Sequence, residues 1–254
     1  MPKIKHPPLL DQVWGIIPAR GGSKSIPYKN LHPIGGRSLL EYQVLAGRAS
    51  GSLDRLVCST EDARIAQACA DLEVEVVPRP VALAQDMSSV IDVLEDLFLS
   101  EAEKCGGMPW AFVLLQPTSP FILPVHISDC VQALRHDKRA GSSQTVAKLP
   151  HNHHAFNQRQ IINGRVGFRF ARQRRLGYSK QTKPTFYSFG NVVASRTLRF
   201  LSQRNVFATP SVPVLIERAY ALDVDGPEDV AYADFCIEKG VVELQHLRQQ
   251  GGQQ

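Results

Sequence analysis

The sequence predicts an α/β fold in which a mainly parallel β-sheet carries helices on both faces. Two patterns in the first two-thirds of the 254 residues support this fold class. Short apolar runs alternate with segments of helical periodicity, which is typical of β-α-β units. Glycine, hydroxyl and amide residues directly follow three of the runs, at 18–30, 59–60 and 116–120. Because ligands bind beyond the carboxyl ends of parallel strands, these three strand ends form the candidate binding region.

The elements of the first two-thirds follow from these runs. We expect strands at 13–17, 56–58, 74–77 and 111–115, and helices at 39–49, 61–71, 90–98 and 125–135. Ser38 with Glu41 three residues later forms a capping box for the first helix, and Ser88 or Ser89 can cap the third. The unbroken apolar run at 111–115 indicates a strand that is covered on both faces.

The last third of the chain has a different pattern. Asn163-Gly164 between apolar residues predicts a β-hairpin, and Val166, Phe168 and Phe170 give that hairpin an apolar side that must pack on something. Beyond the hairpin we expect strands at 187–194, 212–216 and 219–224, with a helix at 196–202. A final helix should begin at Pro227 and stop at Gly240, since proline favours a helix start and glycine a helix end.

Composition and charge restrict the class of protein. An apolar content of 43% with 21% charged residues excludes wholesale disorder. The formal charge of +5 hides a segregation, because residues 138–216 hold 14 Lys or Arg and no acidic residue, and the remainder carries a net charge of −9. Such asymmetry indicates an anionic partner or an interface. No apolar run suits a membrane span or a signal peptide, and the five cysteines lack disulfide or zinc spacing, so we expect a cytoplasmic protein.

The strongest chemical signal is the loop at 17–30. Its adjacent glycines allow a sharp turn whose N–H groups can converge on an anion. Arg20, Lys24 and Lys29 add positive charge within the same loop, and an arginine can bind a phosphate with two hydrogen bonds. The spacing is neither that of a Walker A motif nor G-x-G-x-x-G. The loop therefore predicts phosphate binding, and the alternative is a solvated basic loop.

Asp223 and Asp225 form a second candidate site. Residues two apart in an extended segment share a face, so both carboxylates should point the same way. Mg²⁺ binds one or two carboxylates and completes its octahedron with water and phosphate oxygens. Beside a phosphate loop the pair predicts a metal site. The alternative is an exposed strand end, with Asp225 capping the helix that starts near Pro227.

Two further strand ends carry polar side chains. Gln116, Thr118 and Ser119 follow the buried strand at 111–115, and they can read a base or a sugar or form a plain turn. Arg79 follows the strand at 74–77, where it can meet a base or a phosphate or lie in a proline-stiffened loop.

Four motifs together resemble the CMP-sialic acid synthetases, also called acylneuraminate cytidylyltransferases. They are Ile-Pro-Ala-Arg-x-Gly-Ser-Lys at 17–24 with Lys29-Asn30, Arg79-Pro80 with Leu83-Ala84-x-Asp86, Leu-Gln-Pro-Thr-Ser-Pro at 115–120, and Asp223-x-Asp225 with Pro-Glu-Asp at 227–229. The motifs occur in the family's order and span nearly the whole chain. The resemblance implies a Rossmann-like nucleotidyltransferase fold and a reaction in which CTP and a nonulosonic acid, an acidic nine-carbon sugar, give a CMP-sugar and pyrophosphate.

The resemblance also implies roles for individual residues. The catalytic residues would be Arg20, Lys24, Lys29 and Asp225. The nucleotide-binding residues would be Ala19, Arg20, Gly22, Ser23, Lys29, Asn30, Arg79, Ser88 and Gln116. The sugar-binding residues would be Gln116, Thr118, Ser119, Phe189 and Asn191. Mg²⁺, or Mn²⁺ in its place, would bind to Asp223 and Asp225.

The same resemblance implies one nucleotidyltransferase domain over 1–254 that forms a homodimer. An inserted segment at about 150–186, around the expected hairpin, would serve dimerisation and the substrate. We expect residues 249–254 to be a disordered tail, and we expect neither nucleic acid nor membrane as a partner.

Two departures from the family's pattern concern the sugar. The family usually has Pro-Leu-Arg where this chain has Pro120-Phe121-Ile122, and it usually has Asn-Gly where this chain has Gly190-Asn191. Neuraminic, legionaminic, pseudaminic and related acids therefore stay open, as do another sugar and another nucleotide base. Alternatives from other classes are a nucleic-acid-binding protein, through the basic stretch, and a non-catalytic sugar-nucleotide sensor.

Overall fold

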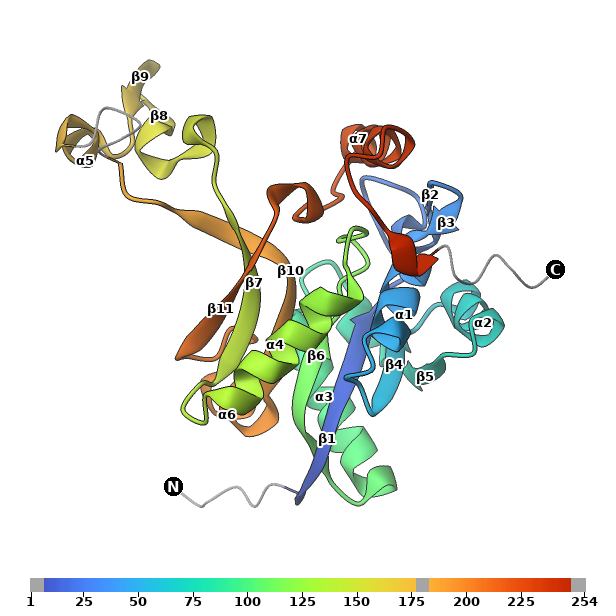
Figure 1. Cartoon of the computed structure of the whole chain (residues 1–254). Coiled ribbons are helices and arrows are strands. Elements are labelled where there is room, and N and C mark those ends of the chain that lie inside the picture. The colour runs from blue at the N-terminus through green and yellow to red at the C-terminus, as the bar shows by residue number, and fades with distance from the viewer. Residues whose placement is uncertain (1–6, 177–182, 248–254) are drawn as a thin grey trace.

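The computed structural model describes residues 7–176 and 183–247, and a twisted seven-stranded sheet forms its centre (Figure 1). The strand order is β11-β7-β10-β6-β1-β4-β5. The strands are β1 (Leu9–Pro18), β4 (Arg55–Thr60), β5 (Glu75–Pro78), β6 (Met108–Leu114), β7 (Ser142–Lys148), β10 (Tyr187–Arg196) and β11 (Ser211–Ile216). In this sheet β10 runs antiparallel to both of its neighbours, and the other pairs are parallel. The predicted α/β class with a mainly parallel sheet is confirmed.

Helices cover both faces of the sheet. One face packs against α1 (Leu39–Ala49), α2 (Ala63–Asp71) and α4 (Pro124–His136), and the other against α3 (Val90–Cys105) and α6 (Thr197–Gln203). Alternation along β1 sends Val13 and Ile17 to the first core and Trp14 and Ile16 to the second, as the period of two in a strand requires. A third, smaller core joins α7 (Pro227–Glu238) to the hairpin of β2 (Pro33–Ile34) and β3 (Arg37–Ser38).

Several predicted helix ends are confirmed. Ser38 Oγ accepts a hydrogen bond from the Glu41 N–H (3.2 Å) at the start of α1, and Ser89 Oγ accepts one from the Ile91 N–H (3.1 Å) at the start of α3. Helix α7 begins at Pro227, and Gly240 follows its end with φ of 65°. Short 3-10 turns complete the framework at η1 (Lys29–Leu31), η2 (Val81–Ala84) and η6 (Gln245–Leu247).

The predicted strand at 219–224 is wrong. The segment begins with a 3-10 turn, η5 (Arg218–Tyr220), and continues without regular structure. Its backbone groups bond to other elements, because the Tyr220 carbonyl accepts from Asn191 Nδ2 (2.9 Å) and the Val224 N–H donates to the Thr118 carbonyl (2.7 Å). The segment is thereby held against the ends of β6 and β10.

Strand β7 was not predicted from the sequence. Its composition, Ser-Ser-Gln-Thr-Val-Ala-Lys, is polar, yet Ser142, Ser143 and Thr145 are fully buried. Each hydroxyl has a partner inside the protein, such as the Cys130 carbonyl for Ser143 and the Val192 carbonyl for Thr145. Hydrogen bonding offsets the cost of burial, so a polar run forms an inner strand.

The segment between β7 and β10 projects from the sheet (Figure 1), and we call residues 150–176 and 183–186 the arm. It contains η3 (His151–His153), η4 (Ala155–Asn157), β8 (Arg159–Ile162), β9 (Arg165–Phe168) and α5 (Ala171–Leu176). The predicted hairpin is confirmed, with Asn163 and Gly164 at φ of 52° and 72° in its turn. The paired side chains of Ile161 and Val166 are 74% and 69% exposed, so this apolar face lacks a covering element among the described residues.

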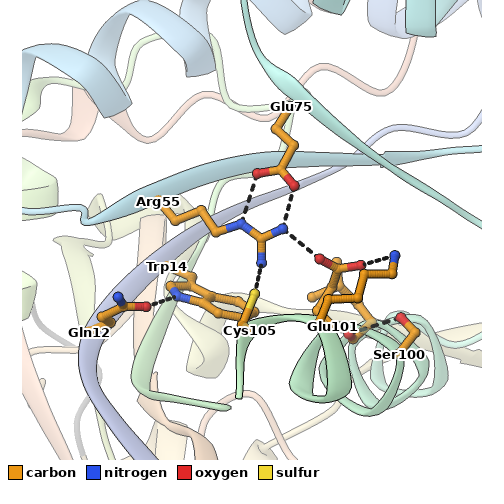
Figure 2. Close-up of polar contacts among 9 residues, drawn as sticks. Gln12, Trp14, Arg55, Glu75, Ser100, Glu101 and Cys105 are labelled. Atoms are coloured by element: carbon orange, nitrogen blue, oxygen red, sulfur yellow. Dashed lines mark hydrogen bonds and ion pairs between the residues drawn. The ribbon is translucent and has the colours of Figure 1, made fainter. Parts of the chain in front are cut away.

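An ionic cluster joins the first residues of β4 and β5 to α3 (Figure 2). It lies at the amino ends of these strands, whereas the motifs follow the carboxyl ends. The guanidinium of Arg55 donates to Glu75 (2.8 Å from Nε) and to Glu101 (2.5 Å from Nη2), and it lies 4.5 Å from the ring centre of Trp14. Within the described ranges no helix is both long and apolar enough to cross a membrane. The predicted tail at 249–254 lies outside the described residues.

Candidate active site

A pocket of about 430 Å³ lies at the carboxyl ends of the adjacent strands β6, β1, β4 and β5. This is where the sequence placed the candidate binding region. Parallel pairing brings the loops together, and the first residues beyond the strands stay in register, as in the hydrogen bond from the Ala19 N–H to the Ser59 carbonyl (3.0 Å). Ten predicted site residues line the pocket: Arg20, Gly22, Ser23, Lys24, Lys29, Asn30, Arg79, Ser88, Gln116 and Thr118.

Two cations of the loop at 17–30 share one protein carboxylate. Arg20 Nη1 lies 3.0 Å from Asp86 Oδ1, and Lys24 Nζ lies 2.6 Å from Asp86 Oδ2. These two cations lower the pKa of the Asp86 carboxyl, with Lys24 as the larger influence. The loop at 17–30 thus has an anionic partner within the chain.

The glycine turn is also used differently from the prediction. The Gly21 N–H donates to Glu61 Oε1 (2.7 Å), so this N–H is engaged by a protein carboxylate and is not available to a bound anion. Glycine is needed here because a Cβ at position 21 would lie 2.3 Å from Asp62 Oδ2. A Cβ at position 22 would meet no atom within 4 Å, and Gly22 lines the pocket.

Lys29 joins the loop to the Asp223–Asp225 segment. Its Nζ donates to the Val224 carbonyl (3.1 Å) and lies 3.5 Å from Asp225 Oδ1. The Lys29 side chain is 17% exposed, whereas that of Asp225 is 81% exposed. The structure therefore brings together two motifs that are separated by nearly 200 residues of sequence.

The two aspartates have different surroundings. Burial by neighbouring protein atoms raises the pKa of the Asp223 carboxyl; a hydrogen bond from Thr118 acts in the opposite direction, and the charge of Asp225 adds to the rise. Asp225 does not cap α7, because Asp229 Oδ2 accepts from the N–H groups of both Asp225 and Gly226 (2.9 Å each). The Asp225 carboxylate is consequently free of a capping role.

These carboxylates fit the needs of a hard divalent cation. Asp223 and Asp225 are two residues apart in a segment without regular structure, and carboxylates are the ligands that such a cation prefers. In the described part of the chain no group of three or more His, Cys, Asp or Glu converges as a metal site. A metal held by two carboxylates must take its other ligands from water and a bound phosphate, which is the coordination that Mg²⁺ commonly has.

Arg79 forms a buried part of the pocket wall. Its side chain donates to the Ser59 carbonyl (2.8 Å), and the residue is 8% exposed. Burial lowers the pKa of Arg79, while the nearby Glu61 carboxylate raises it. The charge of Arg79 is thus placed beneath the pocket with limited access to water.

Six predicted site residues do not line the pocket: the two aspartates, Asp223 and Asp225, which lie beside it through Lys29, and four predicted contact residues. Ala19 and Asn191 are fully buried, Ser119 is 2% exposed, and Phe189 packs edge-on against Phe207 with ring centres 5.3 Å apart. Asn191 Nδ2 instead contacts the Tyr220 carbonyl (2.9 Å) and His126 Nδ1 (3.0 Å), which is a supporting position behind the site.

The two departures from the family's pattern do not face the pocket in this structure. Phe121 and Ile122 are both fully buried in the core, as is Asn191, so none of these side chains reaches the pocket. In this structure these positions belong to the core, and their contact with a sugar stays a prediction.

Some pocket residues escaped prediction. Leu83 and Gln85 line the pocket from the segment before α3, and Val90 and Val93 line it from α3 itself. The two valines look like ordinary apolar residues of a helix, and their position at the first turn of α3 places them against the pocket. Glu61, which engages the loop, gave no sequence signal because it looks like an ordinary residue at a helix start.

Comparisons with known proteins agree with this geometry. The structure of a CMP:2-keto-3-deoxy-manno-octonic acid synthetase complexed with CTP superimposes with a TM-score of 0.66 at 16% identity, covering 90% of this chain and 99% of that one. A 4-diphosphocytidyl-2C-methyl-D-erythritol synthase from Anaerococcus prevotii superimposes with a TM-score of 0.61 at 12% identity, covering 90% and 99%. At such identities the superpositions show a shared fold.

Two relatives found by sequence have a higher identity to this chain than these structures do. An N-acylneuraminate cytidylyltransferase of Streptococcus agalactiae serotype III is 29% identical over 84% of this chain, which spans about half (50%) of that relative's length. A CMP-N,N'-diacetyllegionaminic acid synthase of Legionella pneumophila is 26% identical over 89% of this chain and 97% of its own. The sequence model of the cytidylyltransferases matches residues 14–196, which hold most of the sheet and most of the pocket. The chain therefore belongs to the cytidylyltransferase family.

Proposed function

We propose that the protein transfers the cytidylyl group of CTP to a nonulosonic acid and releases pyrophosphate. The observation that carries the proposal is the contact of Lys29 with Val224 and Asp225, because Lys29 lines the pocket and this contact links it to the segment whose two carboxylates could bind a metal. The names of the relatives from Streptococcus and Legionella support the choice of cytidine nucleotide and acidic sugar. We also propose that the chain is one nucleotidyltransferase domain with the segment at 150–186 inserted.

The chemistry requires positioning and charge neutralisation more than a protein nucleophile. The anomeric hydroxyl of the sugar attacks the α-phosphorus, so a new oxygen–phosphorus bond forms while the bond to the pyrophosphate oxygen breaks. The hydroxyl gives up its proton to solvent, and pyrophosphate leaves with the electron pair of the broken bond and its negative charge. Arg20, Lys24 and Lys29 stabilise that charge from the loop, and Gln116, Thr118 and Ser88 can orient the nucleotide and the sugar from other walls.

Asp223 and Asp225 would hold Mg²⁺, or Mn²⁺ in its place. Bound there, the cation would offset charge on the phosphates, which lets carboxylates and a triphosphate share one site. The cation would bind the ionised carboxylates, and the raised pKa of Asp223 would make this binding more sensitive to acid.

Pyrophosphate release tests the proposal directly. It is measured with each of four NTPs and a panel of neuraminic, legionaminic and pseudaminic acids, with and without Mg²⁺. We expect turnover with CTP and one or more of these acids, dependent on the metal. Asp225→Ala should abolish turnover while the fold stays intact, and rates near wild type at saturating Mg²⁺ would refute the metal assignment. Salt-dependent RNA binding without turnover would favour the nucleic-acid alternative.

We further propose that the arm mediates a homodimer. Its exposed Ile161 and Val166 form an apolar face, and the arm's cations belong to the stretch 138–216, outside which the chain carries a net charge of −9. A second copy therefore offers both charge complementarity and cover for the apolar face. Val166→Asp should shift the protein toward monomer in sedimentation equilibrium, whereas Leu99→Asp, on the 58% exposed Leu99 of α3, should not. A wild-type monomer at high concentration would refute this proposal.

A further inference from the structure

Asp86 lies at the rim of the pocket as a single anion between two cations. Each of its carboxylate oxygens has one cationic partner, Arg20 at 3.0 Å and Lys24 at 2.6 Å. Both cations line the pocket and both are assigned to a polyphosphate in the proposed function. A carboxylate that bridges two cations in this way occupies the same donors that phosphate oxygens would need.

The contact is also exposed enough to be exchanged. The side chain of Asp86 is 46% exposed, and those of Arg20 and Lys24 are 34% and 82% exposed. Ion pairs with such access to water are individually weak. A polyphosphate can offer oxygens to both cations and also reach Lys29, Ser23 and the open backbone at Gly22, none of which Asp86 contacts through a hydrogen bond in the structure.

We propose that Asp86 is an internal competitor for the polyphosphate-binding cations, displaced when the triphosphate binds and returning as pyrophosphate leaves. Asp86 touches neither reacting atom, so it acts by lowering the affinity of the loop for polyphosphate anions. Its return neutralises Arg20 and Lys24 after the bond to pyrophosphate has broken, which favours release of that product. The inference rests on the proposed function for the identity of the anion, and on the geometry alone for the competition.

The segment that carries Asp86 also forms a wall of the nucleotide pocket. Ser88 Oγ accepts from the Gln85 N–H (3.1 Å) and donates to the Ala82 carbonyl (3.2 Å), so residues 82–88 are tied into one turn. Leu83, Gln85 and Ser88 of that turn line the pocket. Displacing Asp86 therefore releases this wall from the loop at 17–30, which couples occupancy of the phosphate end to the position of the wall.

Binding of inorganic pyrophosphate, measured by titration calorimetry without divalent metal, tests the competition. Asp86→Asn removes the charge and nearly keeps the shape, so we expect pyrophosphate to bind about fivefold more tightly, in line with the loss of two exposed ion pairs. Affinity for cytidine, which carries no phosphate and does not compete with Asp86, should not increase in the same way. Pyrophosphate should also become a stronger product inhibitor of the variant in the turnover assay.

Glu75→Gln provides the matched control. Glu75 pairs with Arg55 in the ionic cluster (Figure 2), at the amino ends of β4 and β5 and away from the pocket. Its side chain is 50% exposed, and its substitution removes the same charge from the chain. This control should leave pyrophosphate affinity at the wild-type value. Equal tightening in both variants would show a general effect of net charge and would overturn the proposal.

Weaker or unchanged pyrophosphate binding in Asp86→Asn would also overturn the proposal. Asp86 would then have a structural role, holding the segment 82–88 and the loop at 17–30 in the arrangement that binds the anion. Thermal unfolding verifies that each variant is folded, and Asp86→Ser serves as a second substitution with the same expected tightening. The binding experiment needs neither CTP nor turnover. Failure of the proposed transferase activity is therefore distinguishable from failure of the competition.

Discussion

His126 supports the site from α4, and its protonation should weaken the whole fold. The residue is 6% exposed, and its Nδ1 lies within hydrogen-bond distance of two donors, the Leu123 N–H (3.2 Å) and Asn191 Nδ2 (3.0 Å). Nδ1 must therefore be the unprotonated, accepting nitrogen. Burial lowers the pKa of His126 from 6.5 to about 4, because a charged imidazole would lose its hydration there.

The size of the effect follows from this difference. In the unfolded chain His126 takes up a proton near pH 6.5, whereas in the folded protein it does so only near pH 4. The stabilisation from the neutral buried ring is thus complete above the unfolded pKa and is lost as the pH falls through the folded pKa. At about 1.4 kcal/mol for each unit of pKa, the loss is about 3 kcal/mol of the free energy of unfolding.

Urea unfolding over a pH series from neutral to acid measures this loss. His126→Asn removes the titrating ring but keeps an oxygen that can accept from the same donors, so it serves as the reference. Between neutral pH and about pH 4 the wild type should lose about 3 kcal/mol more than this variant. His136→Asn, on the exposed last turn of the same helix, should follow the wild type. Identical pH profiles for the wild type and His126→Asn would refute the reasoning.

Three further substitutions test the site and its support. Asp223→Asn should raise the calorimetric melting temperature at neutral pH, because burial of Asp223 raises its pKa and so disfavours the ionised carboxylate in the folded protein. The same variant should abolish pyrophosphate release, and a lower melting temperature would contradict the reasoning on stability. Asn191→Ala should reduce the free energy of unfolding in urea by about 3 kcal/mol, because buried acceptors lose their donor; an unchanged transition would argue against the supporting role. Glu101→Gln leaves Arg55 partly unpaired and should cost about 3 kcal/mol in the same assay with kcat unchanged; a parallel loss of kcat would contradict the separation of this cluster from the pocket.

The strand ends could be predicted because local pattern and global topology agree there. Apolar runs such as 111–115 form buried strands wherever helices can cover both faces, and parallel pairing then brings the loops after them together. Ten site residues were found on this basis with the family's motifs.

The remaining features depend on partners that are distant in the sequence. Strand β7 is polar, and its burial is possible only because Ser143 and Thr145 find acceptors on α4 and β10. The segment at 219–224 has the alternation of a strand, but Asn191 and Thr118 take the backbone groups that a neighbouring strand would have needed. Asp86 is part of a recognised motif, yet its pairing with the loop's cations is visible only in three dimensions.

The antiparallel setting of β10 has a consequence for the history and engineering of the arm. Because β7 and β10 are adjacent and antiparallel, with Lys148 opposite Tyr187, the chain leaves and re-enters the sheet at the same point. Neighbours of this kind can be joined by a two-residue turn, whereas parallel strands need a long crossover. The arm is topologically an oversized hairpin loop, so it can be lengthened, shortened or exchanged between proteins without rethreading the strands that carry the pocket.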